Sequence, residues 1–305
     1  MSSSGSRAVD GLHVARAAQL ACVLEASAPK PGNVSPGLPF HDTSYEDFIA
    51  SAVAVGPALA AAGEAPLGST IRAAIAATRR LTRANTNLGI ILLLAPLCRA
   101  ARTQHPGDLR ARVHLVLAQT TVSDAISAYE AIRLAAPSGL GDSPKQDVAE
   151  EPTISLRDAM ALASERDNIA REYVTGFAIT FERGVPSLWA ALSDGLTWSD
   201  AVVEAYLELL AAFPDSHVTR KLGPEAAAEI TRRAGEVVGA GGVRTPKGRA
   251  AVAAFDAELR DSRNSRNPGT TADLTAAAIC AVILMHGWTS TPGRSGAEHV
   301  SRRSQ

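Results

Sequence analysis

Aromatic side chains are scarce in this sequence. They make up only 4% of the 305 residues, and alanine supplies much of the apolar content. β-Sheets are enriched in Val, Ile, Tyr and Phe, whereas alanine-rich sequence favours helices that pack closely. Hydrophobic residues still reach 46%, which is enough to form a sizeable core. The composition therefore predicts an all-α protein, a single-domain multi-helix bundle.

Cysteine is nearly absent as well. Cys22, Cys98 and Cys280 lie far apart, each inside an apolar run with helical character. This spacing argues against a disulfide framework or a zinc site, and it favours buried thiols in a reducing cytosol.

The sequence has no excess charge of either sign and no long hydrophobic run. Lys and Arg number 30 against 31 Asp and Glu, so nothing calls for a nucleic acid partner. The longest apolar runs, Leu88–Cys98 and Leu274–Met285, are shorter than the roughly 20 residues of a membrane span. Residues 1–11 lack the apolar core of a signal peptide. We expect a cytoplasmic enzyme with no membrane or nucleic acid partner, and the oligomeric state stays open.

The familiar nucleotide and hydrolase motifs are missing. The sequence contains no Walker A motif, no Gly-x-Gly-x-x-Gly between a strand and a helix, no nucleophile elbow and no His-Glu-x-x-His. Any nucleotide must therefore be bound by a less common, all-helical design.

Apolar residues recur at helical spacing through residues 9–287, which we expect to form one domain. Residues 1–8 and 288–305 are polar and are predicted to be disordered tails. Residues 137–152, which include Gly139 and Gly141, read as a surface loop. The predicted helices span residues 10–27, 45–62, 66–83, 88–102, 108–117, 121–134, 156–182, 186–192, 199–212, 215–222, 224–238, 246–261 and 271–285. Ser44 resembles the N-cap of the helix over residues 45–62, and Asp47 three residues later completes a weak capping box.

Polar residues gather at the junctions of these helices, where we expect an active-site cleft. Lys30 and Asn33 lie in a Pro- and Gly-rich loop that can offer an ammonium and backbone N–H groups to phosphate, and Asp42 follows. Asn85 and Asn87 precede an apolar helix. Capping needs only one of them, so the other amide is free for a ligand.

Two further junctions carry charge. Asp215 can cap a helix on which His217, Arg220 and Lys221 share one face, an arrangement that a polyphosphate would favour. The segment 267–273 then places Asn267, a Pro-Gly turn with Gly269, and the candidate caps Thr270 and Thr271 before an apolar helix. Asp273, expected in the first turn of that helix, is placed to hold a divalent cation. Each cluster alone also fits ordinary capping or a solvated surface.

Read together, these clusters resemble the triphosphoribosyl-dephospho-CoA synthase family. The matching segments are residues 25–34 (EASAPKPGNV), 85–96 (NTNLGIILLLAP), 215–223 (DSHVTRKLG) and 267–276 (NPGTTADLTA). The resemblance implies a helical fold, the substrates ATP and dephospho-CoA, adenine as the leaving group, and a divalent cation such as Mg²⁺. By motif position it implies these site residues: Lys30, Asn33, Asp42, Asn87, Asp215, Arg220, Lys221 and Asp273.

The details resemble one branch of this family. Members associated with citrate and malonate decarboxylases tend to have His-Lys-Gly near residues 86–89 and Pro-Gly-Gly-Ser-Ala-Asp at residues 268–273. This chain is more similar to the archaeal and methylotroph-type branch, which is linked with methanopterin-type one-carbon metabolism. The resemblance therefore leaves the acceptor open between dephospho-CoA and a related molecule.

These observations give a set of expected roles. We expect Asp215 and Asp273 to hold Mg²⁺, Asp42 to act as the general base and His217 as an acid. The residues expected to bind substrate or phosphate are Lys30, Asn33, Asn85, Asn87, Arg220, Lys221, Asn267, Gly269, Thr270 and Thr271. The alternatives are a Mg²⁺-dependent helical hydrolase of ADP-ribosyl or nucleotide bonds, a ribosyl transfer step in one-carbon cofactor metabolism, and a non-catalytic interaction protein.

Overall fold

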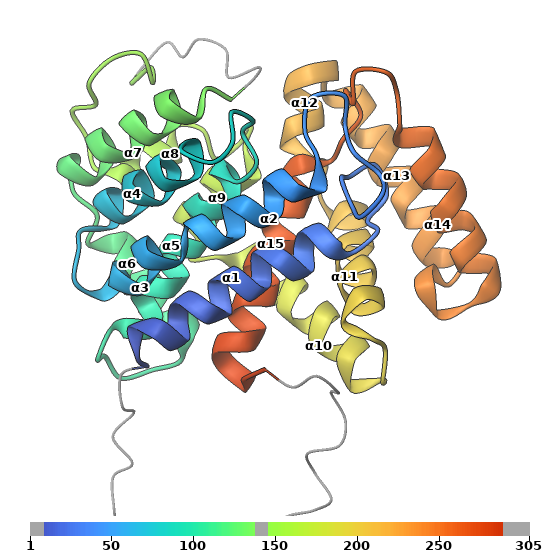
Figure 1. The fold of residues 1–305 in the computed structure, drawn as a ribbon, viewed down its shortest axis with the longest axis horizontal. Helices are drawn as coiled ribbons and strands as arrows, with labels where there is room; N and C mark the ends of the chain where they lie inside the picture. The colour runs from blue at the N-terminus through green and yellow to red at the C-terminus, as the bar shows by residue number, and fades with distance from the viewer. Residues whose placement is uncertain (1–8, 138–145, 289–305) are drawn as a thin grey trace, which may run out of the picture.

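The fold, seen in a computed structural model that describes residues 9–137 and 146–288, is built from helices (Figure 1). Within those two ranges the only β-type pairing is an isolated bridge between Ser35 and Leu38. The all-α prediction is confirmed. The predicted tails and the loop glycines Gly139 and Gly141 lie outside the described residues.

The N-terminal helices form one side of the molecule. They are α1 (Gly11–Ser27), α2 (Tyr45–Ala54), α3 (Gly56–Ala60), η1 (Ala61–Gly63), α4 (Leu67–Arg79), α5 (Leu88–Arg102), α6 (Leu109–Ala118), α7 (Val122–Ala135), α8 (Leu156–Ala161) and α9 (Asn168–Thr175). The capping box predicted for α2 is present: the Ser44 side chain accepts a hydrogen bond from the backbone of Asp47, whose carboxylate accepts one from the Ser44 backbone.

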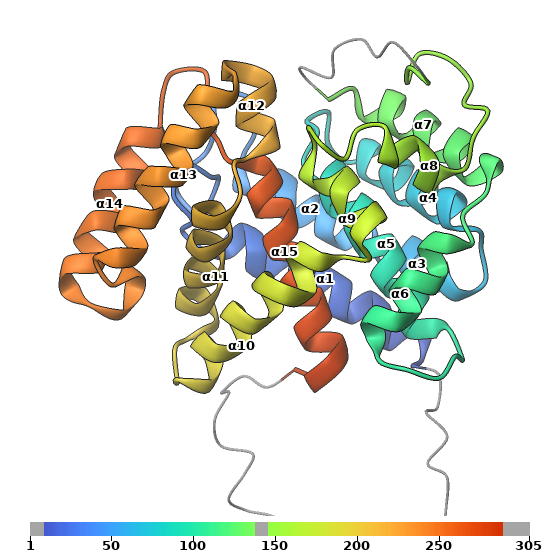
Figure 2. The ribbon, with the colours of Figure 1, turned by 180° about the vertical axis from the view of Figure 1, so that it is seen from behind.

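The C-terminal helices form the other side, and Figure 2 shows them from behind. They are η2 (Thr180–Gly184), α10 (Val185–Ser193), α11 (Trp198–Ala212), α12 (Ser216–Leu222), α13 (Pro224–Gly239), η3 (Gly242–Arg244), α14 (Pro246–Leu259) and α15 (Gly269–His286). In both views α15 runs through the middle of the molecule, between α4 to α9 and α11 to α14.

Helix α15 is the central core helix. Its buried residues include Leu274, Ile279 and Val282. By length and composition alone, two described segments could span a membrane, namely Tyr45–Gly63 and Gly269–His286. The second is 72% buried inside the molecule, as expected of a helix that other helices surround.

The helix predicted for residues 156–182 is broken in the structure. Asp167 begins a new helix by accepting hydrogen bonds from the backbone of Ile169 and Ala170. That helix ends at Gly176, whose φ of 64° suits glycine. The buried Glu172 carboxylate then accepts two backbone hydrogen bonds and one hydroxyl hydrogen bond from the next turn. Helix caps therefore interrupt a segment whose apolar periodicity predicted one continuous helix.

Two smaller predictions were also wrong. The helix predicted over residues 45–62 is interrupted at Val55, just before Pro57, whose ring removes a backbone donor. Trp288, assigned to the C-terminal tail, instead stacks on Trp198 with ring centroids 4.9 Å apart.

Candidate active site

A cavity of about 800 Å³ lies where the helix junctions meet. All four of the polar segments identified in the sequence contribute to its lining. The predicted site residues that line it are Asn33, Asp42, Asn85, Asn87, His217, Arg220, Lys221, Asn267, Gly269 and Asp273. Lys30, Asp215, Thr270 and Thr271 do not line it.

A buried ion pair lies beside this cavity. The Lys30 ammonium lies 3.0 Å from the Glu25 carboxylate, and the two residues are 0% and 3% exposed. Lys30 also donates to the backbone carbonyl groups of Glu25 and Ala28. The expectation that Lys30 contacts phosphate is therefore corrected: its charge is already balanced by Glu25, and it is Glu25 that lines the cavity.

Asp273 is the unpaired carboxylate of the cavity. It forms no hydrogen bond or ion pair with any other described residue. Burial, followed by the nearby Glu25 and Asp215 carboxylates, raises the pKa of Asp273 well above its usual range. Gly89 in α5 makes room for it, because a Cβ atom at residue 89 would overlap the Asp273 carboxylate. The chain therefore keeps space around a carboxylate that it does not neutralise.

The prediction that Asp273 lies in the first turn of its helix is also corrected. Helix α15 begins at Gly269, so Asp273 lies beyond the first turn. It cannot cap the helix or contact the free N–H groups at its N-terminus. Helix capping therefore provides no explanation for this residue.

Asp215 has a structural role. One carboxylate oxygen accepts hydrogen bonds from the backbone of His217 and Val218, which confirms the predicted cap of α12. The other oxygen accepts from the backbone and hydroxyl of Thr271, at 2.7 Å and 2.8 Å. Asp215 is fully buried, so no oxygen faces the cavity. The expectation that Asp215 holds a metal is corrected: this carboxylate joins the starts of α12 and α15.

Thr270 and Thr271 are buried beneath the cavity. They are 1% and 3% exposed, and the Thr271 hydroxyl is held by Asp215. Neither hydroxyl caps α15. The expectation that they bind phosphate is corrected, whereas Gly269 and Asn267 at the same turn do line the cavity.

Helix α12 supplies positive charge to one wall. Arg220 forms an ion pair with Asp167 at 2.5 Å. Lys221 forms no ion pair among the described residues, and burial lowers its pKa while Asp42 opposes that shift. Burial, followed by Lys221 and Arg220, lowers the pKa of His217 to about 3. His217 is therefore neutral at physiological pH and cannot be the cationic acid that we expected.

The four asparagines predicted from the sequence line the cavity in different settings. Asn87 is the N-cap residue of α5, but the Leu88 backbone at the start of this helix donates its hydrogen bond to the Asn85 side chain. Asn87 donates to the Thr78 hydroxyl, which leaves its carbonyl oxygen available. Asn33 donates to the Tyr206 hydroxyl. The Asn267 carbonyl oxygen is buried and has no hydrogen bond partner.

Asp42 lies at the rim of the cavity. Its side chain is 65% exposed, and one oxygen lies 3.7 Å from the His41 ring. The Thr43 hydroxyl donates to its other oxygen. The carboxylate is thus open to water on one side and to the cavity on the other.

Sequence reasoning did not select several charged residues that line the cavity, among them Glu25 and three arginines. Glu25 lies in the first matching segment but was not singled out, although its place in that motif was a signal. Arg83, Arg166 and Arg263 also line the cavity. These arginines follow or interrupt helices and belong to no motif, so no sequence pattern selected them.

The described residues contain no group of three or more His, Cys, Asp or Glu side chains arranged to hold a metal ion. Mg²⁺ is commonly bound through one or two carboxylates together with substrate phosphates, so a smaller protein contribution suffices. Asp273 fits this requirement because its carboxylate is unpaired among the described residues and lines the cavity, as does Glu25. Asp215 does not fit.

The comparisons with known proteins agree on one family. Residues 12–292 match CitG, described as ATP:dephospho-CoA triphosphoribosyl transferase. A crystal structure from Archaeoglobus fulgidus, provisionally described as a triphosphoribosyl-dephospho-CoA synthase, is similar with a TM-score of 0.62 and 32% sequence identity. The match covers 79% of this chain and 100% of the archaeal chain. A comparison with curated proteins finds no match.

The match over nearly the whole chain confirms the resemblance seen in the four segments and does not favour the hydrolase alternative. ATP and dephospho-CoA are accordingly the substrates, and the enzyme is a transferase. This chain belongs to the ATP:dephospho-CoA triphosphoribosyl transferase family.

Proposed function

We propose that the triphosphoribosyl transfer takes place at the end of the cavity where Glu25 and Asp273 lie. The observation that carries this proposal is the unpaired, partly buried Asp273 carboxylate, which lines the cavity together with Glu25 of the Glu25–Lys30 ion pair. Two carboxylates in a site of low dielectric need positive charge to be stable when ionised. The substrates of this reaction provide it: a cation bound to the triphosphate, and the positive charge that develops at the ribose.

We propose that Asp273 and Glu25 would hold Mg²⁺ against the triphosphate of ATP. Carboxylate and phosphate oxygens are the ligands that this ion prefers. The bound ion would supply charge neutralisation, so that acidic side chains and a polyphosphate can share one cavity. Arg220, Lys221 and Arg263 line the same cavity and add positive charge for the phosphates.

The chemistry places clear demands on this site. The 2′-hydroxyl oxygen of dephospho-CoA forms a bond to C1′ of the ATP ribose, and the C1′–N9 bond to adenine breaks. The bonding electrons leave with adenine, which takes up one proton, while the hydroxyl loses one. Positive charge accumulates at C1′ as the bond to adenine lengthens, as it does in glycoside hydrolysis. The Glu25 carboxylate, fixed by Lys30, would stabilise that charge.

Two further residues can complete the transfer. Asp42 remains our candidate to accept the hydroxyl proton, because a carboxylate open to water can pass that proton to solvent after each turnover. The Asn267 carbonyl oxygen is buried without a hydrogen bond donor. The amino group of adenine would satisfy it and orient the leaving base.

We place this activity in the cytoplasm and in one catalytic domain over residues 9–287. The three cysteines are buried and free, which suits a reducing compartment.

The proposed metal contacts can be tested by calorimetry of ATP binding with Mg²⁺ and with EDTA. We expect wild type to bind ATP more tightly with Mg²⁺, and Glu25→Gln to lose most of that difference. Glu46→Gln is the matched control, because Glu46 is exposed on α2 and does not line the cavity. Equal ATP affinity with and without Mg²⁺ in wild type would refute the proposed metal, and a normal Mg²⁺ response in Glu25→Gln would remove Glu25 from it.

A further inference from the structure

The cavity is larger and less uniform than the transfer chemistry alone requires. Away from Glu25 and Asp273 it is lined by apolar side chains of α5, α7 and α8. We call this part the apolar lobe and define it by Leu92, Ile132, Leu156, Ala159 and Met160. Leu92, Ile132, Leu156 and Ala159 are buried, and Met160 is partly exposed. A lobe of this composition suits a long ligand group that carries no charge.

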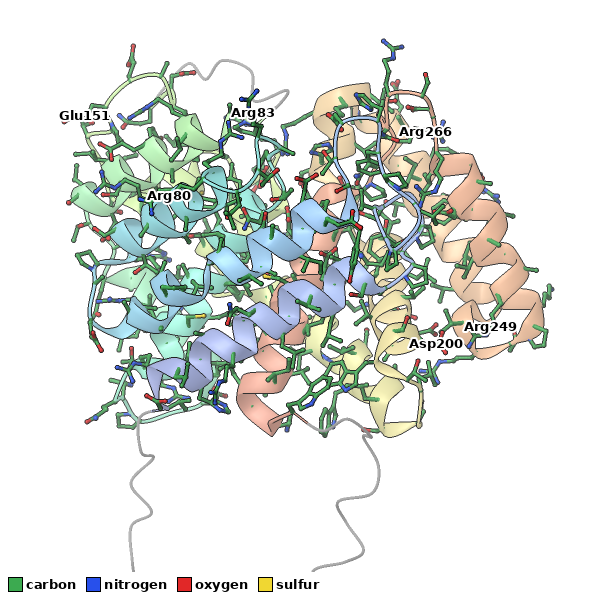
Figure 3. All side chains as sticks on the ribbon, in the orientation of Figure 1. Arg80, Arg83, Glu151, Asp200, Arg249 and Arg266 are labelled. Carbon is green, nitrogen blue, oxygen red and sulfur yellow. The ribbon has the colours of Figure 1, made fainter. Side chains whose placement is uncertain are left out.

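Positive charge borders the apolar lobe. Arg83 precedes α5, and Arg166 lies between α8 and α9; both line the cavity and are exposed. Neither side chain forms an ion pair or a hydrogen bond within the described part of the chain. In the view of Figure 3, Arg83 lies between Arg80 and α12. The lobe therefore lies beside two guanidinium groups that are free to bind phosphate.

The two substrates differ in a way that matches the two ends of this cavity. Both ATP and dephospho-CoA carry a polyphosphate on the 5′ carbon of the ribose that takes part in the reaction. Only dephospho-CoA continues beyond its diphosphate into a long uncharged arm, the pantetheine group. The triphosphate of ATP carries more negative charge than that diphosphate. Lys221 and Arg263, together with Arg220 in its ion pair with Asp167, line the wall formed by α12 and the segment before α15.

We propose that the apolar lobe binds the pantetheine arm of dephospho-CoA, and that Arg83 and Arg166 bind its diphosphate. The acceptor then extends from its reacting ribose at Glu25 and Asp273, past the two arginines, to α7 and α8. The triphosphate of ATP lies on the opposite wall, formed by α12 and the segment before α15. This assignment rests on the proposed location of the transfer, and it makes the lobe the part of the enzyme that recognises the acceptor.

The test compares two acceptors that share one nucleotide. ADP carries the same ribose hydroxyl and a diphosphate but lacks the pantetheine arm. We expect wild type to prefer dephospho-CoA over ADP by about tenfold or more in kcat/KM, because a filled apolar pocket discriminates at this level. Ala159→Leu fills the lobe and should abolish most of this preference, with the rate on ADP and the KM for ATP unchanged.

Matched variants separate the lobe from general damage. Ala161→Leu, on the exposed side of the same helix, should behave as wild type. If Ala159→Leu does not fold, Ala163→Leu tests the same lobe from its partly exposed edge. Arg83→Ala should raise the KM for both acceptors and leave the KM for ATP unchanged, whereas Arg80→Ala, which is outside the cavity, should change neither.

The possible results are distinct. Equal use of ADP and dephospho-CoA by wild type would overturn the proposal, as would an Arg83→Ala variant that raises the KM for ATP instead. An Ala159→Leu variant that slows both acceptors equally would show that the lobe holds a part common to both, such as adenine, and would also overturn it. Each of these leaves triphosphoribosyl transfer intact. Failure of the proposed transfer site would appear differently, as full turnover of both acceptors by Glu25→Gln.

Discussion

Replacing Asp273 with asparagine should make the protein more stable and at the same time nearly inactive. The substitution keeps the shape of the side chain and removes its charge. In the folded protein that charge is partly buried in the cavity and has no hydrogen bond or ion pair among the described residues, and the Glu25 carboxylate acts on it unfavourably. The unfolded chain hydrates the charge fully, so the ionised carboxylate favours unfolding.

The expected magnitude follows from the cost of an unsatisfied buried group. Leaving a polar group buried without a partner costs about 1–3 kcal/mol, and more when it is charged. The asparagine amide would also lack partners. The expected gain in the free energy of unfolding is therefore the difference between the cost of the charged group and that of the amide, about 1–3 kcal/mol at neutral pH. For a protein of this size each 1 kcal/mol moves Tm by roughly 2–4 °C. Turnover should fall about 100- to 1000-fold, as when a charge that stabilises the transition state is removed.

The gain in stability should depend on pH in a defined direction. The folded protein raises the pKa of Asp273 above its ordinary value of 3.8, so it binds this proton more tightly than the unfolded chain does. Wild type therefore loses stability as pH rises above the ordinary value, and the asparagine variant does not. The difference in Tm between wild type and the asparagine variant should be small near pH 4, close to the ordinary pKa of an aspartate side chain. It should grow as the pH is raised toward about 8.

The assay is thermal melting across this pH range, together with adenine release from ATP and dephospho-CoA, on the same preparations. The exposed Asp10, whose side chain forms no hydrogen bond among the described residues, offers a matched surface comparison as Asp10→Asn. A variant that melts below wild type at neutral pH would refute the account of an unpaired buried charge. One that releases adenine at the wild-type rate would remove Asp273 from the chemistry.

Other substitutions separate structural from chemical roles. Lys30→Met leaves Glu25 buried without its counter-charge and should cost about 3–5 kcal/mol in a denaturant titration; an unchanged midpoint would contradict the ion pair. Asp215→Asn breaks the link between α12 and α15 and should cost about 1–3 kcal/mol, yet ATP binding should keep its response to Mg²⁺ in calorimetry; loss of that response would restore Asp215 as a ligand. His217→Asn should reduce the loss of stability on acidification from pH 6.5 to about 3, because the fold lowers the pKa of this histidine; parallel melting curves would contradict this. Gly89→Ala should slow turnover much more than it changes Tm, since the new methyl group displaces the Asp273 carboxylate; normal turnover would show that the space is not needed.

Much of this fold could be predicted from the sequence because its signals are local. Apolar periodicity placed α5 over the same residues that the structure shows, and Ser44 with Asp47 formed the expected capping box. The prediction failed where a distant contact decided the outcome. Glu172 organises the turn that breaks residues 156–182, and no local pattern shows that its carboxylate turns inward.

The candidate site shows the same contrast between local sequence signals and distant contacts. Family motifs selected segments that do line one cavity, but they could not tell which side chains face it. Asp215 and Asp273 look alike in the sequence, yet all of the hydrogen bonds of Asp215 serve α12 and α15 while Asp273 has none. Lys30 was expected to face the ligand but is buried against Glu25, and Glu25 lines the cavity instead, because a buried lysine needs an acidic partner. Such differences depend on tertiary packing.

The central claim is that this chain transfers the triphosphoribosyl group to dephospho-CoA at the cavity that contains Glu25 and Asp273. Mass spectrometry of the products formed from ATP, Mg²⁺ and dephospho-CoA tests it most directly, with wild type, Glu25→Gln and Asp273→Asn compared side by side. We predict that wild type yields triphosphoribosyl-dephospho-CoA and an equal amount of free adenine, and that both variants yield almost none. Adenine released without the coupled product, or full product from both variants, would contradict the account.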